Sequence, residues 1–287
     1  MIDIILFPSS YFNTKKVDED LQQEYNAILS TGLFKILIFG YEQWFDDSEL
    51  ILNDFPNEEH LAIYRGWMMK PEQYKRFYNL LLKKNIRLVT APEYYMLMHV
   101  FPNAYKDIKE DTAKMEIYPL KSKIDVEKLK KSFDKFMIKD YVKSVKGTEF
   151  PVFFDQSINQ KDFDNWMDVF YKYRGELLTG GICIKEFLDL KHYGKNTNEY
   201  RVFYANNKII SVSRNSDQEN NSPKPPKNLI EKYCNLNSPY YSIDYAELEN
   251  GNWKIIEVGD GQVSGLSKYQ DYEQYFTKLF QCFNILF

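Results

Sequence analysis

The chain has 287 residues, of which 44% are hydrophobic and 27% are charged, so it carries enough apolar surface to fold and is not intrinsically disordered. Its 37 basic and 41 acidic residues give a formal net charge of −4, which argues against a nucleic-acid partner bound by bulk charge. No apolar run reaches the roughly 18 residues of a membrane span, and the first residues lack a signal-peptide pattern, so we expect a cytoplasmic protein without membrane contact.

The first part of the chain alternates between two kinds of segment. Short apolar runs rich in β-formers predict strands at residues 2–7, 34–39, 60–64 and 86–89. Helical spacing of apolar residues predicts helices at residues 18–29, 70–84 and 92–99. This alternation is typical of an α/β layer with a mainly parallel sheet, which we expect over residues 1–112.

The pattern changes after a charged stretch at residues 111–130, which leads into a predicted helix at 125–133. From there, β-rich runs joined by tight turns predict strands at 136–141, 181–188, 199–204, 208–214, 241–248 and 253–258. A helix at 162–173 and a segment at 229–234 interrupt these strands, and helical spacing at 272–287 predicts a closing helix. Residues 215–227 are polar and proline-rich, so we expect a mobile surface loop there.

The motifs of several enzyme classes are absent. The three cysteines, Cys183, Cys234 and Cys282, lie far apart, which favours reduced thiols over a disulfide framework or a zinc site. The sequence has no HExxH or CxxC, and it also lacks GxSxG, GxxxxGK[ST] and GxGxxG. These absences argue against a zinc hydrolase, and no nucleophile–base pair points to another hydrolase.

An Asn-Gly pair at 250–251 lies between two β-rich runs, which is the strongest short hairpin signal. In a two-residue type I′ turn, Asp244 faces Glu257, and Glu247 faces Lys254 as an opposite-charge pair on the other side. This register places Asp244 and Glu257 on the side that also carries the apolar residues Ala246, Leu248, Trp253 and Ile255.

Directly opposed carboxylates on an apolar face are destabilising unless one is protonated or a cation lies between them. Asp260 follows three residues after Glu257, so three hard oxygen donors come close together in the sequence. Such donors suit Mg²⁺, which also binds water and phosphate oxygens. The alternative is a solvated sheet end with ordinary surface acids.

Two further segments carry cations that suit a polyphosphate. Lys139 ends a short apolar strand and is followed by a lysine-rich loop with Lys146 and Gly147, although such loops are usually only solvated surface. An Asn-Asn turn at 206–207 predicts that Arg201 opposes Val212, beside an apolar patch and without a directly opposed acid. Arg201 then either binds phosphate or covers apolar surface with its stem.

Taken in order, FMIKDYVKSVKG (136–147), GGICIKEFLDL (180–190), NEYRVFYANNKII (198–210) and SIDYAELENGNWKIIEVGDGQVSG (242–265) resemble the ATP-grasp superfamily, closest in style to its R-two-K clade. The resemblance runs from about Lys114 to Leu266. It implies an α/β fold: a Rossmann-like pre-ATP-grasp domain (1–112), then a nucleotide-binding subdomain (113–190) and a C-terminal subdomain with a metal-binding hairpin (191–287). The last two subdomains are α+β, and the nucleotide would lie between them.

The resemblance implies roles for individual residues. Lys139 would contact the α-phosphate and the adenine region, Lys114 looks like an earlier nucleotide lysine, and Lys146 with Gly147 resembles the loop over the phosphates. Arg201 would steady the γ-phosphate, and one or two Mg²⁺ ions would be held by Asp244, Glu257 and Asp260, although many family members carry asparagine at that last position. The adenine hinge would be formed by Lys185, Glu186, Phe187 and Leu188.

The implied activity is an ADP-forming ligase that activates a small-molecule or peptide carboxylate with ATP for attack by an amine or a thiol. An ATP-dependent phosphotransferase and a non-catalytic nucleotide-binding module remain alternatives, and the sequence leaves a homodimer open. Arg65 and Arg174 are candidates for gripping a substrate carboxylate, with structural salt bridges as the alternative for each. The sequence names neither substrate.

Overall fold

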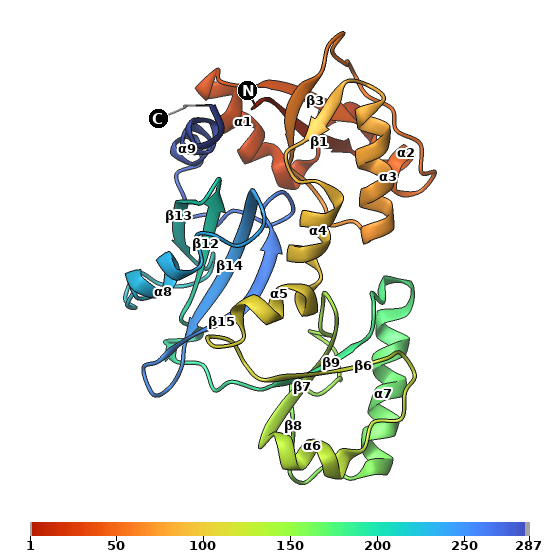
Figure 1. The fold of residues 1–287 in the computed structure, drawn as a ribbon, viewed down its shortest axis with the longest axis vertical. Helices are drawn as coiled ribbons and strands as arrows, with labels where there is room; N and C mark the ends of the chain where they lie inside the picture. The colour runs from red at the N-terminus through yellow and green to blue at the C-terminus, as the bar shows by residue number, and fades with distance from the viewer. Residues whose placement is uncertain (1, 285–287) are drawn as a thin grey trace.

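The computed structural model describes residues 2–284, which form three larger sheets arranged along the long axis of the molecule (Figure 1). The sheet with the first strands lies at one end, a four-stranded sheet lies in the middle, and a second four-stranded sheet lies at the other end. A short ribbon of β10 (His192–Tyr193) and β11 (Asn196–Thr197) precedes the middle sheet. None of the helices in this range is long and apolar enough to cross a bilayer.

The first sheet is built mainly from parallel strands, as the sequence predicts. β1 (Ile2–Ser10) lies between β3 (Lys35–Phe39) and β4 (His60–Tyr64), and β5 (Ile86–Leu88) pairs with β4. The predicted helices are present as α1 (Gln22–Thr31), α3 (Pro71–Leu82) and α4 (Pro92–His99). In this first part of the chain, three short elements were not predicted: β2 (Asn13–Val17), α2 (Tyr41–Phe45) and α5 (Phe101–Ile108).

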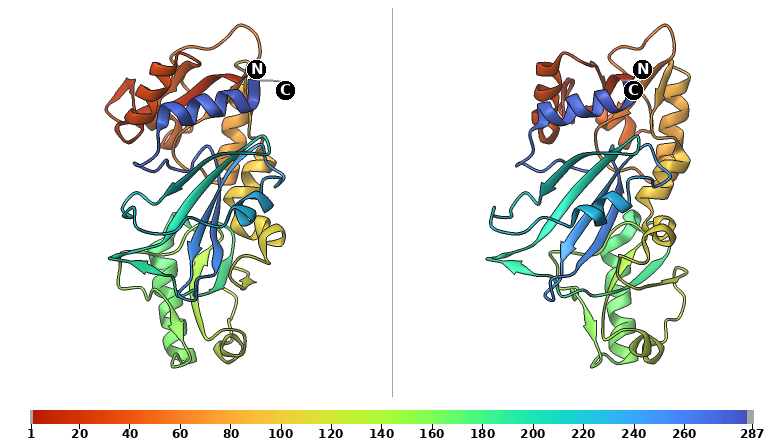
Figure 2. Two further views of the ribbon diagram at one scale, coloured as in Figure 1. Left: turned by 90° about the vertical axis from the view of Figure 1, so that its left-hand side faces the viewer. Right: turned by 60° about the vertical axis from the view of Figure 1, so that its left-hand side comes forward.

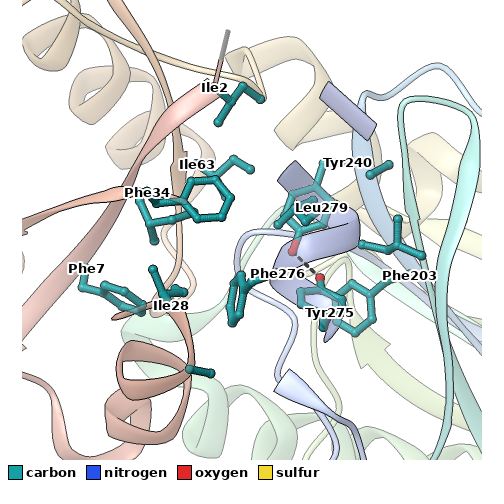
Figure 3. Close-up of a cluster of buried hydrophobic side chains, with 14 of the residues drawn as sticks. Ile2, Phe7, Ile28, Phe34, Ile63, Phe203, Tyr240, Tyr275, Phe276 and Leu279 are labelled. Carbon is teal, nitrogen blue, oxygen red and sulfur yellow. Dashed lines mark hydrogen bonds between the residues drawn. The ribbon is translucent and has the colours of Figure 1, made fainter. Parts of the chain in front are cut away.

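Both faces of this sheet are buried, one against α2 and α3 and the other against α1 and α9 (Tyr272–Asn284). Figure 2 shows α9 lying across the first layer. In Figure 3, the α9 side chains Tyr275, Phe276 and Leu279 lie between side chains of the first layer and those of the middle sheet. The predicted closing helix is therefore confirmed as far as Asn284, and residues 285–287 lie outside the described range.

The middle sheet is antiparallel, in the order β13 (Lys208–Arg214), β12 (Glu199–Ala205), β14 (Tyr240–Glu247) and β15 (Trp253–Asp260). Residues of α4, α5 and α8 (Lys227–Lys232) form a core with one face of it. β15 is an edge strand, and the segment at 111–112 covers part of that edge, because the Ile255 N–H donates to the Asp111 carbonyl.

The third sheet has the order β6 (Met115–Tyr118), β9 (Ile182–Glu186), β7 (Lys135–Asp140) and β8 (Phe154–Asp155). Its apolar face packs against α6 (Val126–Ser132) and α7 (Gln160–Arg174), which places Phe136, Ile138 and Ile184 in a core. Because side chains alternate along a strand, Lys139 and Lys185 leave from the opposite face. That face meets β15.

The β14–β15 hairpin has the predicted acid pair but not the predicted register near its turn. Next to the turn Glu247 pairs with Trp253 instead of the predicted Lys254, because the connection is longer than a two-residue turn. A β-bulge at Ile256 then shifts the register back, so that Asp244 opposes Glu257. The predicted pair is confirmed, and the predicted pairing at the turn is wrong.

In the β12–β13 hairpin, the pairing is predicted correctly next to the turn and wrongly further along the strands. The Asn-Asn turn at 206–207 has positive φ at both residues, and the pairing next to it is the predicted one. A bulge further along makes Arg201 oppose Ser213 instead of Val212. On its other side Arg201 lies opposite Asp244 of β14, so the expectation that no acid faces Arg201 is wrong.

Candidate active site

The candidate site lies where the third sheet meets the edge of the middle sheet. Lys139 of β7 approaches Glu257 of β15, with 4.0 Å between Nζ and Oε1. Lys185 of β9 donates from Nζ to the carbonyl oxygen of Ile256 at 2.7 Å. A bulge leaves its extra residue unpaired in the ladder, which explains why this carbonyl is available to Lys185. The two lysines therefore bridge the two sheets.

Both lysines are nearly buried beside the ring of Phe101, the first residue of α5. The Nζ atoms of Lys139 and Lys185 lie 5.1 and 4.3 Å from the ring centroid, within the range of cation–π attraction. Burial, with the neighbouring charge of Lys139, lowers the pKa of Lys185 to about 7. Negative charge brought between the two sheets would reverse this effect, so the pair suits a polyphosphate.

Asp244 and Glu257 each have cations of the protein beside them. Arg201 donates from Nε and one terminal nitrogen to the two oxygens of Asp244, at 2.7 and 2.6 Å. Burial alone would raise the pKa of Glu257, but the charges of Lys139, Lys143 and Arg201 hold it below its ordinary value. Glu257 is therefore ionised at neutral pH.

The two acids do not lie on the apolar face that the sequence analysis predicted. Ile255 and Val258 pack in the core on one face of β15, whereas Asp244 and Glu257 share the other face with Arg201. The opposed pair therefore does not need a divalent ion to be tolerated, because Arg201 and Lys139 already supply opposite charge.

A cavity of about 250 Å³ opens over the acid pair and is also lined by Met68, His99 and Lys143. Carboxylates on one wall are hard oxygen ligands, and Mg²⁺ commonly takes one or two of these with water and phosphate oxygens in its other positions. Asp244 and Glu257 therefore fit Mg²⁺. Within residues 2–284, no group of three or more His, Cys, Asp or Glu side chains could hold a metal by itself.

Asp260 is not part of this group. Alternation along β15 puts it on the face opposite Glu257, where it is fully buried. Its Oδ1 accepts hydrogen bonds from the backbone and side-chain N–H groups of Gln262, at 3.0 and 3.2 Å. The structure thus keeps Asp260 away from the two acids with which it was predicted to act.

The turn after β7 is held by a buried ion pair. Asp140 accepts hydrogen bonds at Oδ1 from the N–H groups of Val142 and Lys143, at 2.7 and 2.6 Å. Arg174, at the end of α7, binds Oδ2 of the same carboxylate at 2.8–2.9 Å. Arg174, predicted to grip a substrate, instead fixes the turn that carries Lys143 to the cavity.

Three of the predicted nucleotide residues lie apart from the buried lysines. Lys146 and Gly147 are exposed in the loop that follows Lys143, and Gly147 has a φ of 70°. Lys114 donates from Nζ to the Ser132 carbonyl at 3.1 Å, at the end of α6. Among the described residues, no side-chain hydrogen bond or ion pair joins Lys114, Lys146 or Gly147 to Lys139.

Arg65 is enclosed by the protein. Its guanidinium forms two hydrogen bonds of 2.7 Å with the carboxylate of Glu24 and also donates to the carbonyl oxygens of Gly261 and Ser264. Only 1% of the residue is exposed. Because Glu24 already occupies the guanidinium, the predicted grip on a substrate carboxylate has no support here, and Arg65 instead ties the segment after β15 to α1.

Three residues of the predicted adenine hinge, Glu186, Phe187 and Leu188, line a separate cavity of about 440 Å³ together with the tip of the β14–β15 hairpin at Leu248. Lys185, the fourth, does not line it. The N–H groups of Glu186 and Phe187 donate to the carbonyls of Lys114 and Lys135, so the chain leaves β9 in an ordered, extended path. Leu248 follows directly after β14 and is four residues from Asp244, roughly 13 Å at the rise of a strand. The hinge cavity and the acid pair thus lie at successive positions along one hairpin.

Sequence reasoning did not select two residues that line the cavity over the acids. Lys143 had a usable signal, because it belongs to the lysine-rich segment that follows Lys139. His99, the last residue of α4, is nearly buried and stacks on Tyr95 with 4.7 Å between the ring centroids. Burial, with the charge of Lys143, lowers its pKa to about 4, so the ring is neutral. A lone histidine gave no pattern that could have identified it.

Comparison with known proteins agrees with this architecture. Residues 114–279 match the family model of the ATP-grasp domain, R-two-K clade family 3. No curated protein matches the sequence.

Solved structures resemble the chain over nearly its whole length. D-cycloserine synthetase DcsG is 11% identical, with 97% of this chain and 99% of that one covered and a TM-score of 0.65. The D-alanine-D-alanine ligase from Coxiella burnetii is 10% identical, with coverages of 98% and 93% and a TM-score of 0.64. The ATP-grasp ligase PsnB, complexed with a phosphomimetic variant of a minimal precursor, Mg and ADP, is 9% identical, with coverages of 99% and a TM-score of 0.62. At these identities the likeness establishes the fold.

Proposed function

Because this chain belongs to the ATP-grasp domain family of the R-two-K clade, we propose that it is a ligase that uses ATP to activate a carboxylate as an acyl phosphate for attack by an amine or a thiol. ATP and Mg²⁺ are typical of this family, and one of the similar structures contains Mg and ADP. The observation that carries the proposal is the opposed pair of Asp244 and Glu257, which shares one cavity with Arg201 and Lys143.

The nucleotide would lie along the β14–β15 hairpin, between the subdomains at 113–190 and 191–287. The hinge from Lys185 to Leu188 would bind adenine at the tip of the hairpin, where the larger cavity lies. The ammonium groups of Lys139 and Lys185 would neutralise phosphate oxygens further along, since both face β15. Lys146 and Gly147 would cover the phosphates from the exposed loop, and Lys114 would have to leave its contact with Ser132 to take part.

Asp244 and Glu257 would hold Mg²⁺, which supplies positive charge that stabilises the developing charge on the phosphates. Lys143 would orient the γ-phosphate together with Arg201, because both cations line the same cavity as the acids. Arg201 would have to release part of its pairing with Asp244 and Gly265 to do so. A carboxylate oxygen of the substrate attacks the γ-phosphorus, and ADP leaves. The amine or thiol then attacks the acyl carbon, loses its proton, and displaces inorganic phosphate. Alignment and charge stabilisation suffice for both steps, so no nucleophilic side chain is required.

The carboxylic acid and the amine or thiol would enter at the end of the hairpin away from its turn, between the first sheet and the segment after β15. The cavity over the acid pair, called the phosphate cavity from here on, is also lined by Met68 from the part of the chain that forms the first sheet. Ser264 and Gly265 of the segment after β15 line it as well. A neighbouring cavity of about 270 Å³ continues from the same residues toward Trp67. These are the walls that an amine-bearing small molecule or peptide would contact.

Hydroxylamine provides a test that does not require the natural acceptor. The protein is incubated with Mg·ATP, hydroxylamine and a panel of carboxylic acids, and ADP, inorganic phosphate and hydroxamate are measured together. A ligase gives all three in equal amounts. ADP with a phosphorylated product but without free phosphate would identify a phosphotransferase, and Mg·ATP binding without ADP formation across the panel would favour a non-catalytic module.

Glu257→Gln keeps the size of the side chain and removes the charge of the proposed metal ligand. We expect at least a 100-fold loss of ADP formation with an unchanged circular dichroism spectrum, because oriented charge supplies most of the rate in this chemistry. The matched control is Glu127→Gln, whose carboxylate is exposed beside Lys130 in α6. Full turnover in Glu257→Gln would remove this residue from the site.

A further inference from the structure

A second cavity, of about 260 Å³, adjoins the phosphate cavity on the side of β12 and β13. Arg201 and Asp244 line both cavities, so their ion pair forms the wall between them. If the carboxylate of a substrate reacts beside Arg201, the remaining part of that substrate can therefore extend into the second cavity.

Arg214, the last residue of β13, supplies an unmatched positive charge in this second cavity. In the described residues, none of its nitrogens lies within salt-bridge distance of a carboxylate, and its terminal amino groups have no hydrogen-bond acceptor. The other nearby cations are paired, Arg201 with Asp244 and Lys268 with Asp217.

The guanidinium of Arg214 is held in place by its surroundings. Nε donates to the carbonyl oxygen of Gln218 at 3.0 Å, and Cζ lies 3.8 Å from the ring centroid of Tyr269. Gln218 is itself fixed, since only 1% of it is exposed and its side chain donates to Asn198. With Nε bonded and one face covered by the ring, the outer edge with the terminal amino groups remains for a ligand.

The chemistry of the walls favours a carboxylate over a phosphate dianion. Glu199 lines the same cavity, and its negative charge would disfavour a second charge on the ligand. Asn215, Ser216 and Ser267 add groups that can donate hydrogen bonds to an oxygen anion. A planar carboxylate matches the fork of an arginine, which binds such groups through two parallel hydrogen bonds.

We propose that the activated substrate carries a second carboxylate, which binds the outer edge of Arg214 while the reacting carboxylate lies beside Arg201. The substrate class is then a dicarboxylic acid, either a small molecule or a peptide with two acidic groups. This inference rests on the proposed function, because it assumes that the space next to Arg201 receives the acid.

Binding is measured by calorimetry on the full chain saturated with Mg·AMPPNP, so that no turnover is needed. The probes are succinate, glutarate, adipate and the acidic dipeptide N-acetyl-Glu-Glu-amide, each compared with the analogue in which one carboxylate is a primary amide. We expect at least one diacid to bind 10- to 100-fold more tightly than its amide, the range for a charge-assisted bidentate contact. Preference for one of the small diacids would indicate a small-molecule substrate, and preference for the dipeptide would indicate a peptide substrate.

Arg214→Gln should abolish this preference and leave the affinity for Mg·AMPPNP within twofold. Arg214→Lys keeps the charge but not the fork, so it should lose most of the preference while folding as the wild type does. Lys268→Gln is the control, since Lys268 also lies over Tyr269 but is paired with Asp217. Wild-type protein without a preference for any of the diacids, or Arg214→Gln that retains it, would overturn the inference. Hydroxamate formation from monoacids would leave the ligase proposal standing in either case.

Discussion

Asp260 is a carboxylic acid that the fold removes completely from water. Burial raises its pKa to about 7, and Oδ2 has no hydrogen-bond partner among the described residues, although the nearby Thr90 hydroxyl lowers the pKa somewhat. The folded protein therefore holds a proton on Asp260 at pH values where the unfolded chain, with a pKa near 3.9, has lost it. The contribution of Asp260 to stability must fall as the pH rises from about 4 through 7.

Asp260→Asn should stabilise the protein at alkaline pH, because the amide carries no charge and its nitrogen can donate to Thr90. We expect a gain on the order of 1–3 kcal/mol in the free energy of unfolding at pH 8.5 and a much smaller change at pH 5. Urea denaturation at the two pH values measures it. Asp217→Asn, at an exposed position, is the control. An equal effect at both pH values would contradict the assigned proton.

At the same scale, the sequence identified the acids but not their partners. Asp244 and Glu257 could be paired from one hairpin, because the turn residues lie close to them in the chain. Arg201 is 43 residues from Asp244, and its position opposite this acid depends on β12 lying between β13 and β14. That strand order is set by long-range packing, which local patterns do not contain.

At the scale of elements, the two hairpins show how far a turn signal reaches. Asparagine at 206–207 predicts the pairing beside it, and a bulge then changes every pair further along. In β14–β15 the turn is one residue longer than predicted, which shifts the pairs next to it by one residue. The extra residue of the bulge, Ile256, shifts the register back by one, so the predicted pairing of Asp244 with Glu257 is recovered. The correct prediction of the acid pair therefore required two unseen features to compensate.

The turn between β7 and the exposed loop should depend on α7 through Arg174. Arg174→Gln leaves the buried carboxylate of Asp140 without its cation and loosens the turn that carries Lys143. We expect about a 10- to 100-fold lower kcat/KM for Mg·ATP in the ADP-forming assay, since small displacements of catalytic groups have effects of this size.

The control for this change is Lys172→Gln, in the same last turn of α7. Lys143→Ala should lower the rate in the wild type but add little in the Arg174→Gln background, because the second change removes a group that is already misplaced. Fully additive effects of the two substitutions would show that Arg174 affects turnover independently of Lys143, and would contradict its role in placing Lys143.

At the scale of the whole molecule, the sequence predicted most strands and long helices but not how distant segments share a core. α4 and α5 come from the first part of the chain and pack on the middle sheet, while α9 comes from the last part and packs on the first sheet. Phe101 shows the consequence, because a residue in an unpredicted helix contacts both buried lysines.

Arg65 joins these parts electrostatically, and breaking its ion pair should affect the whole fold. Arg65→Met leaves Glu24 buried without a cation, which we expect to cost about 3–5 kcal/mol in the free energy of unfolding. Adding Glu24→Leu should recover part of the loss. Arg87→Gln, which breaks an exposed pair with Glu59, should cost less than about 1 kcal/mol. Urea denaturation measures all of these variants, and similar losses for Arg65→Met and Arg87→Gln would contradict this view.

The contact between α9 and the first layer has a consequence for biosynthesis. The backbone of Ile2 is hydrogen-bonded to the side chain of Asn284, although 282 positions separate them. During translation, the first sheet therefore emerges from the ribosome before α9, which covers one of its faces. The core between the third sheet and helices α6 and α7 comes from one continuous stretch of the chain. We expect that stretch to resist protease on stalled nascent chains well before the opening strands do, and the N-terminal layer to need chaperone protection until translation has passed α9.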